Sequence, residues 1–216
     1  MDSVSLRSFL RGIEEELKKR DEVHGMVQGD MRKVLRLSKQ AILSVHQGRF
    51  DDARSSLEEA DGLFAKLKDV SKDHPNLVYT GLVDAAFEEY AEARTFLRLV
   101  EDGRFVNPRK LGVPSVPYVL GLADVIGEFR RRALDSLRRG DVEAAEDCLR
   151  VMEEIYAELT AMDEAYFLVP GLRRKCDVAR RVIESTRGDV TIEARRSSLE
   201  RSIRGLEETL KEKGKG

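Results

Sequence analysis

Residues 82–97 read LVDAAFEEYAEARTFL, and the apolar positions in this run recur every three or four residues. That spacing is typical of an amphipathic helix that buries one stripe of its surface. The same period recurs at 6–17, 31–45, 50–67, 122–137, 142–159 and from 172 to about 212, and no stretch alternates as a strand does. The sequence therefore predicts an all-α fold, a bundle of six or seven mostly antiparallel long helices joined by short loops.

Glycine and proline mark the expected helix ends. Gly48 and Gly140 follow helical segments and are typical C-cap signals. Pro75 ends the segment before it, because the residue preceding a proline is pushed out of the α region. The longest proline-marked connection, 107–117, is the one plausible internal boundary, yet we expect a single domain. We expect this domain to span residues 1–216 and one of its helices to begin near Asn76. We also expect the last helix to be broken or kinked near Gly188-Asp189 and residues 211–216 to form a frayed tail.

Composition bounds the class of protein. Of 216 residues, 36% are charged and 41% hydrophobic, which excludes a disordered chain. No apolar run approaches the roughly 18 to 20 residues of a membrane span, and the first eleven residues lack the apolar core of a secretory signal, so we expect a cytoplasmic protein with no membrane partner. Cys148 and Cys176 stand alone, which excludes a disulfide framework and a thiolate zinc site of the usual spacing. A net charge of −2 supplies no general attraction to nucleic acid, although local basic surfaces remain compatible with it.

Two helical segments depart from the usual pairing of acids with bases. Glu89 and Glu92 lie about 60° apart on one helix face, and no Lys or Arg follows or precedes Glu89 by three or four positions. Asp124 and Glu128 are like charges at i,i+4, an arrangement that costs a few tenths of a kcal/mol unless a cation relieves it. If the two segments are neighbours, the four carboxylates converge.

Carboxylate oxygens are the ligands that Mg²⁺ prefers, completed by waters and substrate phosphate. Four converging carboxylates therefore favour metal-assisted phosphoryl chemistry, in which the metal activates a water against a phosphodiester. The competing interpretation is that both clusters are solvated polar faces, with Arg131 or Arg132 pairing with Glu128. A di-iron bundle is disfavoured because no His stands three residues after a Glu.

Basic residues gather in two places that are candidates for contact with a phosphate backbone. The first follows one flank of the segment 31–45 and the second crowds the start of the last helix. A solvated face is the alternative for both groups. The candidate nucleic-acid-binding residues are Arg32, Arg36 and Lys39 in the first group and Arg173, Arg174 and Arg180 in the second.

Two motifs in this sequence resemble the translin and translin-associated factor X (Trax) family. They are DAAFEEYAEA at 84–93 and GLADVIGE at 121–128, and both their order and their spacing match. The resemblance extends from the region of Met31 through Gly140-Asp141 and the last helices. It implies a seven-helix all-α protein that assembles into a closed octameric shell and binds single-stranded RNA or DNA on an inward-facing basic surface.

The resemblance also implies an activity. Members of the Trax branch are Mg²⁺-dependent endoribonucleases that remove passenger strands or trim precursor RNAs, and Mn²⁺ is expected to substitute for Mg²⁺. Carried over by motif, the catalytic and metal-binding residues are Glu89, Glu92, Asp124 and Glu128. Translin itself replaces acids of this set with apolar residues, so the chain is similar to the nuclease branch. Its short ends and its Arg/Glu-rich style suggest an archaeal member that acts as a homo-oligomer without a separate translin partner.

Two alternatives stay open. One is a shell that binds single-stranded RNA or DNA without cutting it. The other is an all-α nucleotide pyrophosphohydrolase, a class that also holds Mg²⁺ with Glu-x-x-Glu and a second acidic pair. The second motif here is Asp-x-x-x-Glu rather than the Glu-x-x-Asp of those enzymes, which ranks this alternative last.

Overall fold

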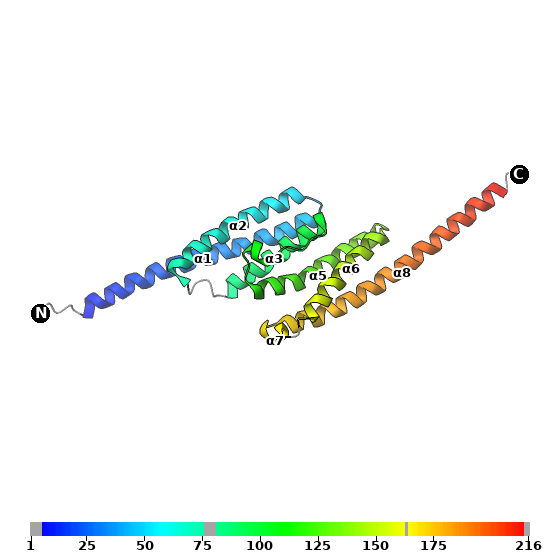
Figure 1. Cartoon of the computed structure of the whole chain (residues 1–216). Coiled ribbons are helices and arrows are strands. Elements are labelled where there is room, and N and C mark those ends of the chain that lie inside the picture. Colours follow the sequence, from blue (N-terminus) through cyan, green and yellow to red (C-terminus); the bar gives the residue numbers. More distant parts are fainter. Residues whose placement is uncertain (1–5, 76–80, 163, 214–216) are drawn as a thin grey trace. The chain divides into compact units, whose positions relative to one another are not determined.

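The computed structural model describes residues 6–75, 81–162 and 164–213, and within these residues the protein is built from helices and contains no strand (Figure 1). Six helices are long and two are single turns, which confirms the predicted all-α class. The helices are α1 (Leu6–His46), α2 (Phe50–Asp73), α3 (Gly81–Asp102), α4 (Pro108–Leu111), α5 (Ser115–Arg138), α6 (Val142–Thr160), α7 (Ala165–Leu168) and α8 (Leu172–Lys213).

The chain divides into two compact units, Met1–Pro117 and Tyr118–Gly216. The division falls at the end of the proline-marked connection. In the first unit α1 packs along both α2 and α3, and the buried side chains include Met31, Val34, Leu57, Ala86 and Phe96. In the second unit α6 packs along α8, and the buried side chains include Ile126, Met152, Ile155, Leu172 and Ile183. Cys148 and Cys176 are buried free thiols.

Several predicted helix ends are confirmed. Gly48 and Gly140 follow α1 and α5 with φ of +72° and +77°, a left-handed conformation that glycine adopts without the steric cost of a Cβ. Helix α2 ends at Asp73, two residues before Pro75. Within the connection, the Asn107 side chain accepts a 2.9 Å hydrogen bond from the Arg109 N–H and caps α4. The predicted start at Asn76 and the last residues of the predicted frayed tail, 214–216, lie outside the described residues.

Two predicted interruptions are absent. The segments 6–17 and 31–45 belong to one helix, α1, and the residues between them contain no proline that would end it. Helix α8 also continues through Gly188. The Arg130 side chain on α5 reaches Thr186, with Nη1 2.8 Å from Oγ1, and Asp189, with Nη1 3.7 Å from Oδ2, so α5 supports α8 on both sides of the glycine.

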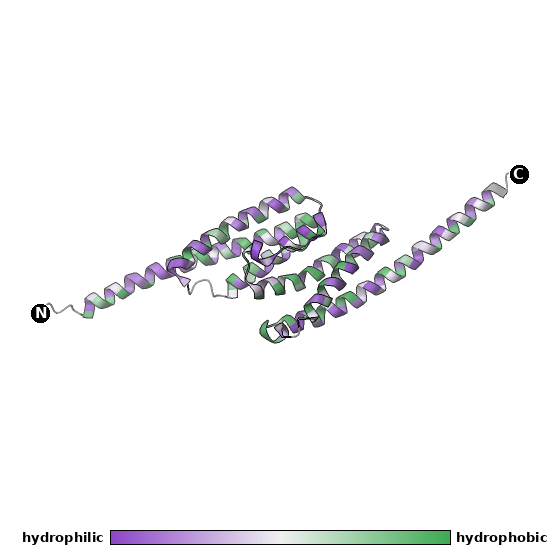
Figure 2. Cartoon of the chain, viewed as in Figure 1, coloured by the Kyte–Doolittle hydropathy of each residue, from purple (hydrophilic) through white to green (hydrophobic). Residues whose placement is uncertain are grey.

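Both terminal helices carry apolar side chains that the chain itself does not bury. Figure 2 shows hydrophobic and hydrophilic residues alternating along the first part of α1 and the last part of α8, which extend past the other helices of their own units. The stripe at 6–17, expected to be buried, is instead exposed, because no described helix of its own unit packs against it. No described helix combines the length and apolarity needed to cross a bilayer. The exposed large apolar residues of these two ends are Leu6, Phe9, Leu10, Ile13 and Leu17 on α1 and Ile192, Leu199, Ile203, Leu206 and Leu210 on α8.

Candidate active site

Helix α3 presents Glu89 and Glu92 one turn apart. The Glu92 residue is only 8% exposed, and the Glu89 side chain is 22% exposed. The burial of Glu92 argues against the interpretation of this cluster as a solvated face, since a buried carboxylate is costly unless other groups compensate for its lost hydration. Glu89 has no Lys or Arg within one turn of its own helix, but α1 supplies a cation: Lys39 Nζ lies 3.9 Å from Glu89 Oε2.

Helix α3 is anchored beside these acids by Tyr90. Its hydroxyl donates to the Asp61 carboxylate on α2 and accepts a 3.0 Å hydrogen bond from Arg94 Nε, while Arg94 also pairs with Asp61. Burial and then the hydrogen bond to Asp61 raise the pKa of Tyr90 well above its usual value. The Tyr90 and Phe64 rings meet edge to face with centroids 5.1 Å apart. These contacts fix the rotation of α3 and hence the direction in which Glu89 and Glu92 project.

Helix α5 carries the second acidic pair, Asp124 and Glu128, on adjacent turns. Both residues are partly buried, while Val125, Ile126 and Phe129 on the same helix are buried. Asp124 pairs with a lysine of α8, with Lys175 Nζ 2.5 Å from Asp124 Oδ2. Helix α8 therefore brings a positive charge onto one member of the predicted catalytic set.

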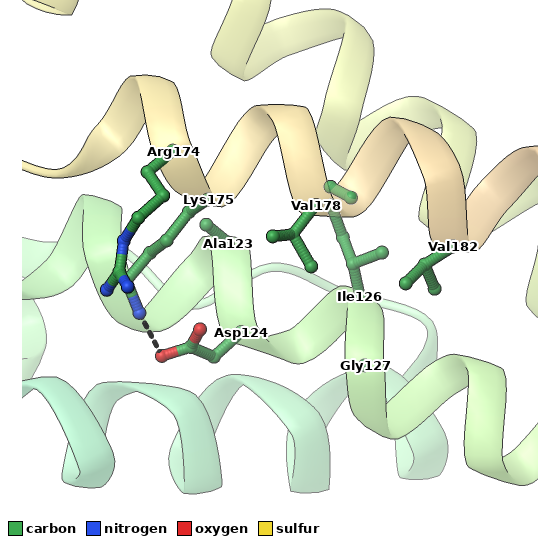
Figure 3. A pocket seen from close by; sticks show the side chains of 9 residues that line it. Ala123, Asp124, Ile126, Gly127, Arg174, Lys175, Val178 and Val182 are labelled. Carbon is green, nitrogen blue, oxygen red and sulfur yellow. Dashed lines mark hydrogen bonds and ion pairs between the residues drawn. The ribbon is translucent and has the colours of Figure 1, made fainter.

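A pocket of about 280 Å³ opens beside Asp124, between α5 and α8 (Figure 3). Its floor is aliphatic and its polar end holds Asp124, Arg174 and Lys175. Gly127 also borders it, and a Cβ added there would meet no atom within 4 Å, so this glycine is not required by close packing. The aliphatic lining consists of Ala123, Ile126, Val178, Ala179 and Val182.

The predicted basic residues form two groups, one on α1 and one on α8. Arg32, Arg36 and Lys39 are exposed at i, i+4 and i+7 on α1, so they follow one face of that helix. The approach of Lys39 to Glu89 places the end of this row beside the carboxylates of α3.

The second basic group lies on different sides of α8. Arg174 borders the pocket, whereas Arg173 and Arg180 lie about 140–160° around the helix from Lys175 at 100° per residue. All three are exposed. The sequence predicts no particular role for Lys175, because its partner Asp124 is 51 positions away and no local spacing reveals the pair.

The donor set of each pair suits a hard cation. In neither unit do the described residues gather three or more His, Cys, Asp or Glu side chains into a group that could hold a metal ion. Each unit instead offers one pair of carboxylates on adjacent turns of a helix. Mg²⁺ needs only one or two protein carboxylates and takes its other ligands from water and phosphate. The residues present therefore fit Mg²⁺ by the chemistry of their oxygens.

This fold belongs to a known class. The sequence profile of the translin family matches residues 18–185. The chain is therefore a member of the translin family, as its two motifs predicted.

Solved structures and a curated relative agree with that assignment. The chain is similar to AfC3PO, solved alone (32% identity, TM-score 0.77) and as a complex with duplex RNA (32% identity, TM-score 0.75), each alignment covering 86% of this chain and 96% of the other. It shares the fold of apo-NeC3PO, at 24% identity and a TM-score of 0.76 over 85% of this chain and 96% of the other. An uncharacterised protein of Methanocaldococcus jannaschii is 27% identical over 81% of this chain and 78% of its own length.

Proposed function

We propose that this chain is a Mg²⁺-dependent endoribonuclease that acts on single-stranded RNA inside a homo-oligomeric shell in the cytoplasm. The observation that carries the proposal is the acidic set of a translin-family chain: Glu89 and Glu92 on α3, with Asp124 and Glu128 on α5. AfC3PO, which is 32% identical to this chain, forms a complex with duplex RNA, and this supports RNA as the ligand.

In this proposal the four carboxylates hold the metal, Mg²⁺ or in its place Mn²⁺. The bound ion supplies activation of a water and neutralisation of charge on the scissile phosphodiester. Glu92 is the more buried of the pair on α3, so its carboxylate is held the more rigidly. Either Glu92 or Glu128 orients the attacking water.

RNA binding in the proposal depends on the exposed cations. Arg32, Arg36 and Lys39 track the phosphate backbone toward Glu89, and Arg174 holds a phosphate near Asp124. Arg173 and Arg180 extend the basic surface on the other side of α8. Single-stranded DNA also carries one phosphate charge per nucleotide and is a second candidate ligand.

The exposed apolar stripes on α1 and α8 support the assembly of several copies. Five large apolar side chains between Leu6 and Leu17 and five between Ile192 and Leu210 are exposed, and apolar surface of this kind is typical of an interaction site. We propose a closed homo-oligomer, an octamer, whose interior contains the acidic residues and the basic row.

The test is a cleavage assay on end-labelled single-stranded RNA with Glu89→Gln and Asp124→Asn, which remove a charge and keep the side-chain shape. Both variants should lose cleavage by at least a hundredfold while fluorescence anisotropy shows RNA binding unchanged within about twofold. Glu153→Gln on α6, which removes a carboxylate outside the set, is the matched control. Undiminished cleavage in both variants would remove the site assignment.

The substrates in the same assay separate the alternatives. A duplex RNA arm is included because the AfC3PO complex contains a duplex. Binding of RNA with no metal-dependent product would favour a shell that binds without cutting. Hydrolysis of free nucleoside triphosphates in preference to RNA would favour the pyrophosphohydrolase alternative.

A further inference from the structure

The ion pair between Lys175 and Asp124 has a consequence for metal loading. Lys175 Nζ lies 2.5 Å from Asp124 Oδ2, and the lysine side chain is only 19% exposed. The carboxylate that the proposed function assigns to the metal is therefore already neutralised by a cation of the chain itself. By comparison, Lys39 lies 3.9 Å from Glu89 with a side chain that is 68% exposed, which is a much looser contact.

An ammonium group and a divalent ion compete for that carboxylate. Mg²⁺ binds carboxylate oxygens at about 2.1 Å, so an ammonium group hydrogen-bonded to Oδ2 would stand within a few ångströms of a doubly charged ion and be repelled by it. The Asp124 side chain is 37% exposed, and ion pairs of this exposure are weak enough for a divalent ion to displace them.

The pocket gives the displaced side chain a place to go. Lys175 and Arg174 both border it, next to an aliphatic floor with no other carboxylate than Asp124 in its lining. An ammonium group released from Asp124 into this polar end would stand beside a second cation, an arrangement that favours an anion such as an RNA phosphate.

We propose that Lys175 is a metal-responsive positioning residue: it holds Asp124 while the metal is absent, is displaced when the metal binds, and then faces the pocket as a phosphate-binding cation together with Arg174. This inference rests on the proposed function, because it takes Asp124 as a ligand of the metal. It predicts that Lys175 lowers the affinity of the chain for the metal and that the Lys175 amine becomes more exposed when the metal binds.

The first experiment titrates the full chain with Mn²⁺ in the absence of RNA and follows the free ion by electron paramagnetic resonance. Lys175→Met should tighten Mn²⁺ binding by roughly fivefold, the equivalent of losing one weak competing ion pair. Arg187→Met is the matched control, because Arg187 is also on α8 and pairs with a carboxylate, Glu153, outside the acidic set. Its Mn²⁺ affinity should equal that of the unmodified chain.

The second experiment measures the reactivity of the Lys175 amine toward an acylating reagent, quantified by mass spectrometry with and without Mn²⁺. Mn²⁺ should raise labelling of Lys175 several-fold and leave Lys33 unchanged, since Lys33 pairs with Glu59 and not with a proposed ligand. A role that is only structural would not produce this metal-dependent change.

The outcomes separate the two proposals. Mn²⁺ binding that Asp124→Asn abolishes but Lys175→Met leaves unchanged or weakens, with constant Lys175 labelling, would overturn the inference and leave the proposed function standing. No Mn²⁺ binding to the unmodified chain would overturn both.

Discussion

Lys175 Nζ and Asp124 Oδ2 are 2.5 Å apart, and the pair joins α8 to α5 at the rim of the pocket. The pair connects a residue of the sequence motif at 121–128 with one that no motif includes. Because a salt bridge of this exposure contributes at most about 1 kcal/mol, its larger effect is on the charge of Asp124 rather than on the stability of the fold.

The basic row on α1 should contribute to RNA affinity through phosphate contacts. We expect Arg32→Gln combined with Arg36→Gln to weaken binding of single-stranded RNA and to reduce the slope of log K against log salt by about 1.4, or about 0.7 per lost contact. Anisotropy titrations at several salt concentrations measure this slope. Lys72→Gln, which removes an exposed lysine paired with Asp69 on α2, is the control, and an equal loss of slope there would contradict the assignment.

The two sides of α8 should differ in their effect on RNA binding. Arg174 borders the pocket beside Asp124, whereas Arg180 lies on the opposite side of the helix. If RNA follows the pocket, Arg174→Gln should weaken binding several-fold more than Arg180→Gln, measured in EDTA so that no substrate is cut. The reverse order would move the RNA path to the other side of α8.

The hydroxyl of Tyr90 should contribute to stability in a way that depends on pH. Tyr90→Phe removes the hydrogen bonds to Asp61 and Arg94 and should lower the free energy of unfolding near pH 7 by about 1 kcal/mol, measured by urea denaturation.

The sign of the pH effect follows from the raised pKa of Tyr90, whose first cause is burial. Below the unfolded pKa of about 10, tyrosine is protonated in both states and its contribution is fully present. As the pH rises above 10, the tyrosine of the unfolded state loses its proton first. The free energy of unfolding then falls by up to about 1.4 kcal/mol per pH unit until the pH reaches the pKa of Tyr90 in the folded state. The stability advantage of the unmodified chain over Tyr90→Phe should therefore shrink above about pH 10 and then change sign; a constant difference would contradict the account.

Two glycines should respond oppositely to alanine. Gly188 lies inside α8 and a Cβ there meets no atom within 4 Å, so Gly188→Ala should raise the free energy of unfolding by about 0.5–1 kcal/mol. Gly140 has φ +77°, which strains any residue with a Cβ, so Gly140→Ala should destabilise the protein by about 1 kcal/mol. Thermal unfolding of both variants checks the pair, and stabilisation by Gly140→Ala would contradict the assigned backbone conformation.

The helical class could be predicted from periodicity because the period of 3.6 residues recurs in almost every segment, as in residues 82–97. The continuity of α1 and α8 could not be predicted in this way. The expectation of a break at Gly188 rests on the local cost of a glycine in a helix, about 1 kcal/mol. In the structure Arg130 contacts α8 on both sides of Gly188, and its partner Thr186 is 56 positions away in the sequence. Long-range contacts of this kind have no signature in a local sequence window.

The candidate site, too, could be predicted from the sequence only in part. Spacing predicted that Glu89 and Glu92 share one side of a helix, and the two motifs indicated the family. Spacing did not predict that Glu92 is buried, that Lys39 approaches Glu89, or that Lys175 pairs with Asp124, because each depends on how one helix packs against another.

The measurement that tests the central proposal most directly is cleavage of a labelled single-stranded RNA by the full chain, in Mg²⁺ and in EDTA, with Glu92→Gln assayed beside it. The account predicts product only from the unmodified chain in Mg²⁺, and intact RNA in the other lanes although binding persists. Equal cleavage in EDTA, or undiminished cleavage by Glu92→Gln, would contradict a metal site built on these carboxylates.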